Sequence, residues 1–201
     1  MLHKIADAVG DLSAFKTVVE IGPGMGALTK YLLKQNHPDF FVVELDDRWA
    51  EYLLNTYPAL RGKVIHEDFL KTDLEFLQNP THVVGNFPYN ISSQIVFRII
   101  DERENVEMVT GMFQKEVAVR VASGPGNKDY GILSVLVQAF FKVEYLFDVN
   151  EGSFDPPPKV KSGVIRLTNL GDPWKVGKDY PRLLRLVKAA FGQRRKQLRN
   201  P

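Results

Sequence analysis

The chain has 201 residues, of which 44% are hydrophobic, 25% charged and 11% aromatic, with a formal net charge of +2. These proportions exclude wholesale disorder and a fibrous repeat, and no apolar run approaches the roughly 18–20 residues that a membrane-spanning helix needs. The absence of cysteine excludes disulfides, thiolate zinc sites and cysteine nucleophiles. Together with the lack of a signal-peptide core after Met1, it leads us to expect a cytoplasmic protein that does not contact membranes.

The net charge hides an asymmetry between the two ends of the chain. Residues 1–156 contain 14 Lys and Arg against 22 Asp and Glu, whereas residues 157–201 contain 12 against 2. A basic end beside an acidic body indicates contact with a polyanion such as nucleic acid, because phosphate contacts dominate the affinity of such complexes. A solvated helix face followed by a polar tail is the alternative, and charge alone leaves both open.

Short runs of β-branched and aromatic residues alternate with helical patterns along most of the chain. This alternation predicts an α/β fold with a mostly parallel sheet covered by helices on both faces. The last two strands are joined by a proline-rich loop rather than a helix, so that they are candidates for antiparallel pairing. The predicted strands cover residues 17–21, 40–44, 64–66, 82–85, 106–113, 143–149 and 163–167, and the predicted helices cover residues 25–34, 48–55, 92–100, 114–121, 132–139 and 183–191.

The first motif with chemical meaning lies between the first strand and the first helix, at Glu20-Ile21-Gly22-Pro23-Gly24-Met25-Gly26-Ala27. Glycines at this place let the backbone turn tightly and let a ligand approach the main chain at a helix N-terminus. The motif fits the dinucleotide fingerprint G-x-G-x-x-G/A. It also fits the E-x-G-x-G-x-G pattern of methyltransferases that use S-adenosylmethionine, and an ordinary turn without a ligand is the third alternative.

Two carboxylates follow at the ends of the next two strands. Glu44 ends the second strand about twenty residues after the glycines, where a carboxylate can accept both hydroxyls of a ribose. Both nucleotide interpretations require it, and the adjacent Asp46 and Asp47 are expected to be turn or helix-cap residues. After the third strand, Asp68 can accept from an adenine amino group while Phe69 flanks the ring, although an aspartate at this place is commonly a turn former.

The motif that separates the alternatives is Gly85-Asn86-Phe87-Pro88-Tyr89, after the fourth strand. The exocyclic amine of adenine is a poor nucleophile because its lone pair is delocalised into the ring. A side-chain amide oxygen from Asn86 and a backbone carbonyl fixed by Pro88 can accept its two N–H groups and point the lone pair at an electrophilic methyl group. Tyr89 can stack on a flipped base. Nicotinamide chemistry needs no such arrangement.

On these motifs the sequence resembles the ribosomal RNA adenine dimethyltransferases of the KsgA/Dim1 type, over nearly the whole chain. The resemblance implies a Rossmann-like S-adenosylmethionine-dependent methyltransferase fold with a seven-stranded sheet and the start of a C-terminal helical region. Phe87 stands where the family usually has leucine or isoleucine. The matching segments are residues 20–24, 43–46, 86–92, 114–118, 130–135 and 154–160.

The resemblance also assigns roles to individual residues. It implies that Asn86, Pro88 and Tyr89 hold the target adenine and that Phe154 closes on its other face. It implies that the methyl donor, S-adenosylmethionine, contacts Gly22, Glu44, Asp68 and Asn86, and we expect the motif residues Glu20, Gly24 and Phe69 to belong to the same site. The basic residues expected to contact RNA phosphates are Lys159, Lys161, Arg194, Arg195 and Lys196. The four histidines lack metal-ligand spacing, so no metal is expected, and Trp49 and Trp174 are expected to be packing residues.

Two departures from the family pattern concern the ends of the chain. A segment with a Gln-x-Phe-Leu core, usual before the first helix, is not found after Met1, and the family continues beyond Gln193-Arg194-Arg195-Lys196 into a small helical domain. We therefore expect a catalytic domain over residues 1–170 and the truncated start of a helical domain over residues 171–201.

The sequence thus predicts a monomeric enzyme that methylates adenines. The resemblance favours two adjacent adenines in small-subunit ribosomal RNA, methylated during ribosome biogenesis. Within the same class, the rival is the macrolide-resistance type that acts on large-subunit RNA. The two alternatives from other classes are a non-catalytic RNA-binding assembly factor on the same fold and an NAD-dependent dehydrogenase. The dehydrogenase would explain the segment from Gly22 to Glu44 but would leave the Asn-Phe-Pro-Tyr motif without a use.

Overall fold

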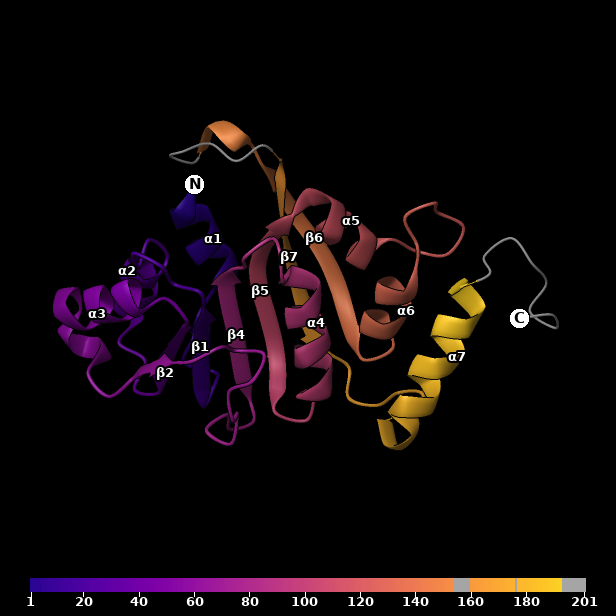
Figure 1. The fold of residues 1–201 in the computed structure, drawn as a ribbon, viewed down its shortest axis with the longest axis horizontal. Coiled ribbons are helices and arrows are strands. Elements are labelled where there is room, and N and C mark those ends of the chain that lie inside the picture. Colours follow the sequence, from indigo (N-terminus) through magenta and orange to yellow (C-terminus); the bar gives the residue numbers. More distant parts are fainter. Residues whose placement is uncertain (154–159, 176, 193–201) are drawn as a thin grey trace.

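The computed structural model describes residues 1–153, 160–175 and 177–192, which form a seven-stranded sheet with helices on both faces (Figure 1). The strands are β1 (Thr17–Ile21), β2 (Phe40–Glu44), β3 (Val64–His66), β4 (Thr81–Asn86), β5 (Val106–Gln114), β6 (Phe141–Val149) and β7 (Ser162–Asn169). The helices are α1 (Leu2–Val9), α2 (Thr29–Leu32), α3 (Asp47–Thr56), α4 (Ser92–Asp101), α5 (Lys115–Ala122), α6 (Ile132–Gln138) and α7 (Tyr180–Gly192).

The strand order is β3-β2-β1-β4-β5-β7-β6, and the first five of these strands are parallel to their neighbours. β7 runs antiparallel to both β5 and β6, which confirms the pairing predicted for the last two strands. Parallel strands are covered on both faces and therefore read as continuous apolar runs, which is why the patterns of β1 and β2 locate these strands to the residue. No helix in the described part of the chain is long and apolar enough to cross a membrane.

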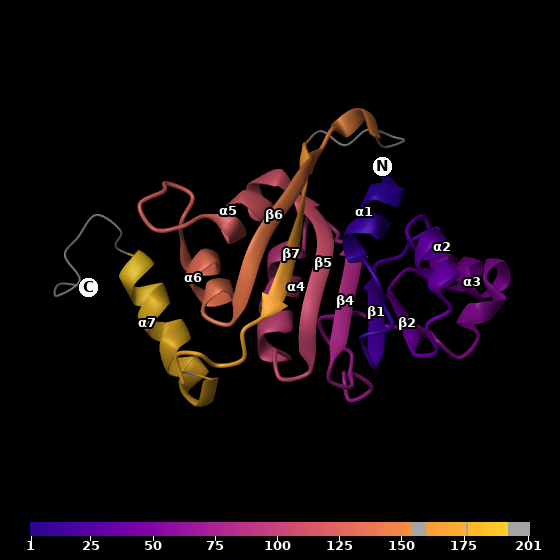
Figure 2. The same cartoon turned by 180° about the vertical axis from the view of Figure 1, so that it is seen from behind.

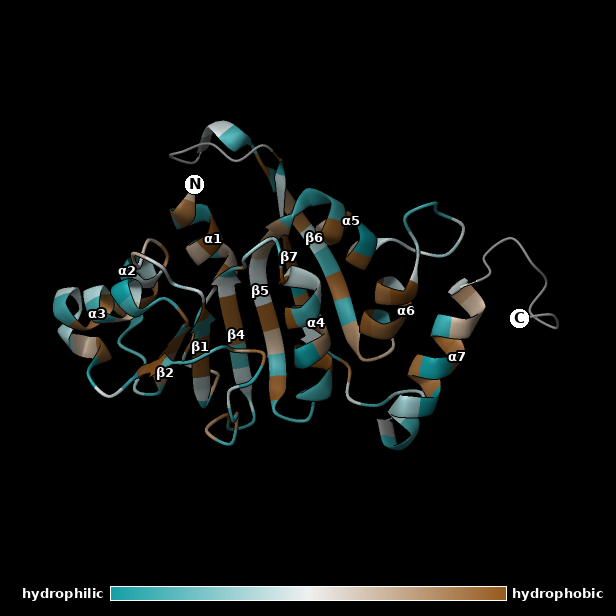
Figure 3. Cartoon of the chain, viewed as in Figure 1, coloured by the Kyte–Doolittle hydropathy of each residue, from teal (hydrophilic) through white to brown (hydrophobic). Residues whose placement is uncertain are grey.

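Neighbouring residues of each strand enter two different cores. Val18, Val42 and Val84 pack with α1, α2 and α3 on one face, and Val19 and Val83 pack with α4, α5, α6 and α7 on the other. Figures 1 and 2 show α4, α5 and α6 on one side of the sheet and α1 on the opposite side. Hydrophobic residues are concentrated along β4 and β5 in the middle of the sheet (Figure 3). Because both faces of the sheet are packed against helices, the position of the strands is well defined, and so is the edge at which the parallel strands end.

The helix predicted over residues 25–34 is shorter in the structure. α2 begins only at Thr29 and continues as a 3-10 turn over Leu33–Gln35. The preceding segment is a series of turns in which Gly26 has a φ of 75°, a value that a right-handed helix does not allow. The predicted start of this helix was wrong because the sequence pattern typical of a helix already begins within the glycine turn.

Helix α7 packs on the helical layer of the same core. Val187 is buried with residues of α4 and α6, and the rings of Phe140 and Tyr180 lie 5.8 Å apart. Trp174, in the connection before α7, is 67% exposed, so its predicted packing role is wrong. The domain boundary at residue 170 stays a prediction.

Candidate active site

The carboxyl ends of β1, β2, β3 and β4 meet at one edge of the sheet. The chain passes from β1 outward to β3 and then returns to β4 on the other side of β1, so that two crossovers diverge there. Such a switch point is where open α/β sheets bind their ligands. A cavity of about 680 Å³ lies at this edge, and its lining residues are Ile21, Gly22, Val43, Glu44, Leu45, Asp46, Asp47, Arg48, Glu67, Asp68, Phe69, Pro88, Asn90 and Ile91.

The glycine turn forms one wall of the cavity. Gly22 has a φ of 64° and Gly24 a φ of 54°, conformations that favour glycine. The amide of Gly22 donates to the carbonyl of Val43 over 2.9 Å, which holds the turn against β2. A Cβ added at Gly22 would lie 3.5 Å from Pro88, so the turn lies close to the Asn-Phe-Pro-Tyr segment. A side chain at Gly22 would thus point toward Pro88, which lines the same cavity.

Glu44 is 7% exposed and accepts three backbone hydrogen bonds at the end of β2. Its Oε2 accepts from the amide of Gly24 over 2.9 Å, and its Oε1 accepts from the amides of Leu45 and Asp46 over 2.8 and 2.9 Å. A carboxylate offers about four lone-pair directions, so that about one is left for a further donor. Acceptance of both ribose hydroxyls would therefore require Glu44 to share or release one of these amides.

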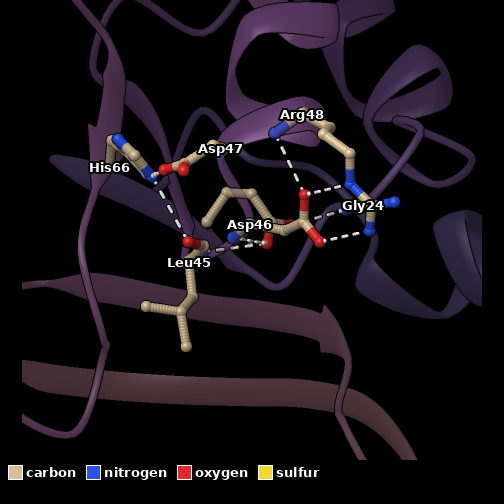
Figure 4. Close-up of polar contacts among 7 residues, drawn as sticks. Gly24, Leu45, Asp46, Asp47, Arg48 and His66 are labelled. Atoms are coloured by element: carbon tan, nitrogen blue, oxygen red, sulfur yellow. Dashed lines mark hydrogen bonds and ion pairs between the residues drawn. The ribbon is translucent and has the colours of Figure 1, made fainter.

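A polar cluster braces the segment after Glu44, which forms the rim of the cavity (Figure 4). Asp46 caps α3 by accepting from the amide of Arg48, and its Oδ2 lies 2.7 Å from Nη2 of Arg48. This hydrogen bond to the guanidinium lowers the pKa of Asp46 to about 2. On the other side of the rim, Nε2 of His66 lies 2.8 Å from Oδ1 of Asp47 and 3.3 Å from the carbonyl of Leu45. The helix-cap interpretation of Asp46 is thus confirmed, whereas Asp47 pairs with His66.

Glu20 is the one predicted donor-site carboxylate that does not reach the cavity. It is 1% exposed and does not line the cavity, and Oγ1 of Thr29 donates to its Oε2 over 2.7 Å. Burial raises the pKa of Glu20 to about 8, so the group is largely neutral at pH 7. In the structure Glu20 therefore connects β1 to α2 through Thr29, on either side of the glycine turn in the chain. Contact with a donor stays a prediction.

Asp68 and Phe69 lie on the opposite wall, after β3. Oδ1 of Asp68 accepts from the amide of Leu70 over 3.0 Å, and its Oδ2 lies 3.8 Å from Nζ of Lys71. Asp68 therefore closes a turn and lines the cavity at the same time, so that the two interpretations of this residue are compatible. Phe69 is 5% exposed and contributes apolar surface to the same wall.

The Asn-Phe-Pro-Tyr segment starts at the end of β4, beside this cavity. Ile21 of β1 pairs with Gly85 of β4, so the glycine turn and this segment leave adjacent strands at the same level. The side chain of Asn86 is exposed, and Pro88 lines the cavity. Phe87 is 1% exposed and its ring lies against Gly85 and Gly111, where any Cβ would overlap it. These two glycines explain how the chain accommodates phenylalanine at a position where the family usually has a smaller side chain.

Of the remaining predicted site residues, the structure describes Tyr89 and Lys161. The hydroxyl of Tyr89 lies 2.5 Å from Oγ of Ser162, the first residue of β7, and Ser92 donates to the carbonyl of Tyr89 over 3.1 Å. Lys161 is exposed and adjoins Ser162. The other predicted residues, which lie outside the described residues, are Phe154, Lys159, Arg194, Arg195 and Lys196.

Sequence reasoning missed several residues of the cavity wall. Leu45, Arg48, Asn90 and Ile91 line the cavity although none was predicted to contact a ligand. Their signal is positional, because each lies within five residues of Glu44 or Asn86, the predicted site residues that end β2 and β4. Among the described residues, no group of three or more His, Asp or Glu side chains is placed to hold a metal ion.

The strand order, the glycine turn, the carboxylate that ends β2 and the cavity between them define a Rossmann-like methyltransferase that uses S-adenosylmethionine as methyl donor. Residues 1–201 match the model of the family described as ribosomal RNA adenine dimethylase, and the chain belongs to this family. This membership excludes the dehydrogenase that the glycine motif alone left open.

Known proteins of this kind are similar over most of their length. A protein of Parabacteroides distasonis named ribosomal RNA small subunit methyltransferase A is 52% identical over 201 residues, which cover 98% of this chain and 75% of that protein. A crystal structure of a dimethyladenosine transferase from Plasmodium falciparum has a TM-score of 0.80 at 29% identity, covering 97% of this chain and 71% of the other. The 23S rRNA methyltransferase ErmE has a TM-score of 0.76 at 28% identity, covering 98% and 78%.

Proposed function

We propose that this protein transfers methyl groups from S-adenosylmethionine to the exocyclic amines of two adjacent adenines in small-subunit ribosomal RNA, acting as a monomer on a subunit precursor in the cytoplasm. The observation that carries the proposal is the Asn-Phe-Pro-Tyr segment at the end of β4, which leaves the sheet beside the glycine turn and lines the same cavity through Pro88. Relatives named small subunit methyltransferase A, at 50–52% identity, support the choice of RNA.

The residues of the cavity fit the proposed donor. Bound S-adenosylmethionine supplies an electrophilic methyl group on a sulfonium centre. Glu44 would hold the ribose, because its carboxylate lines the cavity and keeps a free lone pair, and Phe69 would offer apolar surface beside the adenine ring. Asp68 would accept from the adenine amino group, and Gly22 and Gly24 would let the donor approach the backbone.

Asn86, Pro88 and Tyr89 would orient the target base at the mouth of the cavity. The amide oxygen of Asn86 and the carbonyl of Pro88 would accept the two N–H groups of the amine, which localises the nitrogen lone pair toward the methyl group. Tyr89 would stack on one face of the flipped base, and Phe154 would close on the other. Positioning then supplies most of the rate enhancement. No strong base is needed, because the amine becomes acidic only after it has gained the methyl group.

The basic end of the chain would hold the RNA. Lys159, Lys161, Arg194, Arg195 and Lys196 would contact phosphates, which fixes the position of the RNA without reading its sequence. Phosphate contacts of this kind supply most of the affinity and make it dependent on salt. The proposal thus separates residues that bind RNA from residues that act on the reacting nitrogen.

The test is methylation of undermethylated small ribosomal subunits, with large subunits as the control substrate and saturating donor. We expect Asn86→Ala to slow transfer by about 10²–10³, by analogy with the loss of one oriented polar contact at a reacting centre. Arg194→Ala combined with Arg195→Ala should weaken RNA binding, reduce its salt dependence and leave the rate at saturating RNA near that of the wild type.

Three outcomes would contradict the proposal. Methylation of large subunits in preference to small ones would favour the type of activity named for ErmE. RNA binding without methyl transfer to either subunit would favour an assembly factor. A normal rate for Asn86→Ala, with loss of chemistry in the arginine variant at saturating RNA, would show that the division between catalytic and RNA-binding residues is wrong.

A further inference from the structure

One hydrogen bond joins the Asn-Phe-Pro-Tyr segment to the opposite part of the catalytic edge. The hydroxyl of Tyr89 lies 2.5 Å from Oγ of Ser162, which is 0% exposed and 73 positions further along the chain. Either hydroxyl can donate in this pair. Ser162 does not line the cavity that we assign to the methyl donor. Its contact with Tyr89 is therefore a contact with the acceptor side of the proposed site.

The backbone of Ser162 is fixed by two neighbouring strands. Ser162 is the first residue of β7 and pairs with Gln114 of β5 and with Val149 of β6. The residue before it accepts a backbone hydrogen bond, because the amide of Lys115 donates to the carbonyl of Lys161 over 2.9 Å. A hydroxyl on such a backbone is a rigid anchor for the ring that bonds to it.

Tyr89 is held at its other end as well. Its carbonyl accepts from Oγ of Ser92, the first residue of α4, over 3.1 Å, and Pro88 restricts the backbone before it. The tyrosine side chain is only half-buried, so packing alone does not define its orientation. With the carbonyl bonded at one end and the phenol hydroxyl at the other, the ring is tethered across the end of β5.

We propose that Ser162 is a positioning residue that sets the orientation of the Tyr89 ring against the target adenine. The proposal rests on the proposed function, because it requires Tyr89 to stack on the base.

A double-mutant cycle tests the proposal, with Ser162→Ala, Tyr89→Phe and the combined variant assayed on small ribosomal subunits at saturating donor and RNA. Removal of a neutral hydrogen bond corresponds to about a 3- to 10-fold effect, so we expect each single variant to lower kcat by that factor. The combined variant should be no slower than the slower single variant, because both changes remove the same bond. The KM for the donor should stay unchanged.

Ser134→Ala is the matched control. Ser134 is also 0% exposed, its hydroxyl donates to the carbonyl of Arg120 and accepts from the amide of Gly131, and it does not line the cavity assigned to the donor. It should reduce stability to urea as Ser162→Ala does but leave kcat unchanged. Ser162→Thr, which keeps the hydroxyl, should retain more of kcat than Ser162→Ala.

The outcomes separate this proposal from the proposed function. If the wild type methylates small subunits but the two single effects on kcat multiply in the combined variant, Ser162 does not act through Tyr89. A fall in kcat for Ser134→Ala equal to that for Ser162→Ala would show that lost stability explains both. A wild type that methylates neither subunit would overturn the proposed function and this proposal together.

Discussion

Replacement of Glu44 by glutamine tests the proposed donor site, because the hydrogen bonds of this carboxylate are fully described. The carboxylate of Glu44 accepts from the amides of Gly24, Leu45 and Asp46, and has about one lone-pair direction left. Glutamine keeps the shape, but its NH₂ group can only donate where the carboxylate accepts. Hydrogen bonds to charged groups contribute about 1.5–3 kcal/mol, so we expect Glu44→Gln to weaken donor binding about 10- to 100-fold.

Isothermal titration of the folded variant with S-adenosylmethionine measures this effect, and Asp46→Asn is the control. Asp46 lines the same cavity, but its carboxylate is occupied by the side chain and the amide of Arg48. We therefore expect Asp46→Asn to change donor affinity by less than about threefold, within the range of a solvent-exposed polar contact. Unchanged affinity in Glu44→Gln, with unfolding like that of the wild type, would refute the assignment.

Two further predictions concern stability. The Cβ of Gly111→Ala would overlap the ring of Phe87, so the substitution should destabilise the protein by about 1–3 kcal/mol. In a Phe87→Leu background the penalty, measured by urea unfolding, should be smaller but not zero, because the added Cβ would still lie 2.8 Å from the carbonyl of Gly85. Burial lowers the pKa of His82 to about 3, so neutral His82 stabilises the fold above pH 6.5 and this stabilisation is lost as the pH falls toward 3. Burial raises the pKa of Glu20 to about 8, so protonated Glu20 stabilises the fold below pH 4.5 and this stabilisation is lost as the pH rises toward 8. The two pH dependences oppose each other between pH 4.5 and 6.5, so Glu20→Gln isolates the effect of His82. From pH 7 to pH 5 the free energy of unfolding of Glu20→Gln should fall by about 2 kcal/mol more than that of the double variant Glu20→Gln with His82→Gln. Equal pH profiles for these two variants would contradict this explanation.

The strands and the order of the motifs were predictable because their signals are local. β1, β2 and β3 have the predicted ends, since each is a short apolar run bounded by turn residues. No helix was predicted over residues 2–9, yet α1 forms there, because its stability comes from Ile5 and Val9 packing in the core rather than from its eight residues alone. Elements that depend on distant partners leave a weaker trace in the sequence.

The same distinction applies within the site. The sequence places Glu20 and Glu44 at comparable positions on adjacent strands and cannot tell which carboxylate faces a ligand. In the structure Glu20 is buried against Thr29, whereas Glu44 lines the cavity. The bond from Tyr89 to Ser162 joins residues 73 positions apart and depends on the antiparallel insertion of β7 beside β5. No spacing rule predicts such a contact, because it requires the tertiary arrangement of the sheet.

The proposed donor and acceptor parts of the site approach each other at Gly22 and Pro88, which both line the cavity. Gly22 bonds to β2 through the carbonyl of Val43, and its Cα faces Pro88, which precedes the tyrosine anchored on β7. The backbone bond from Gly22 to Val43 ties the glycine turn to the strand that carries Glu44, and the bond from Tyr89 to Ser162 ties the segment after Pro88 to β7. Methyl transfer in line requires the amine and the methyl group to be fixed relative to each other. The two bonds that fix the glycine turn and Tyr89 would meet this requirement at the proposed site.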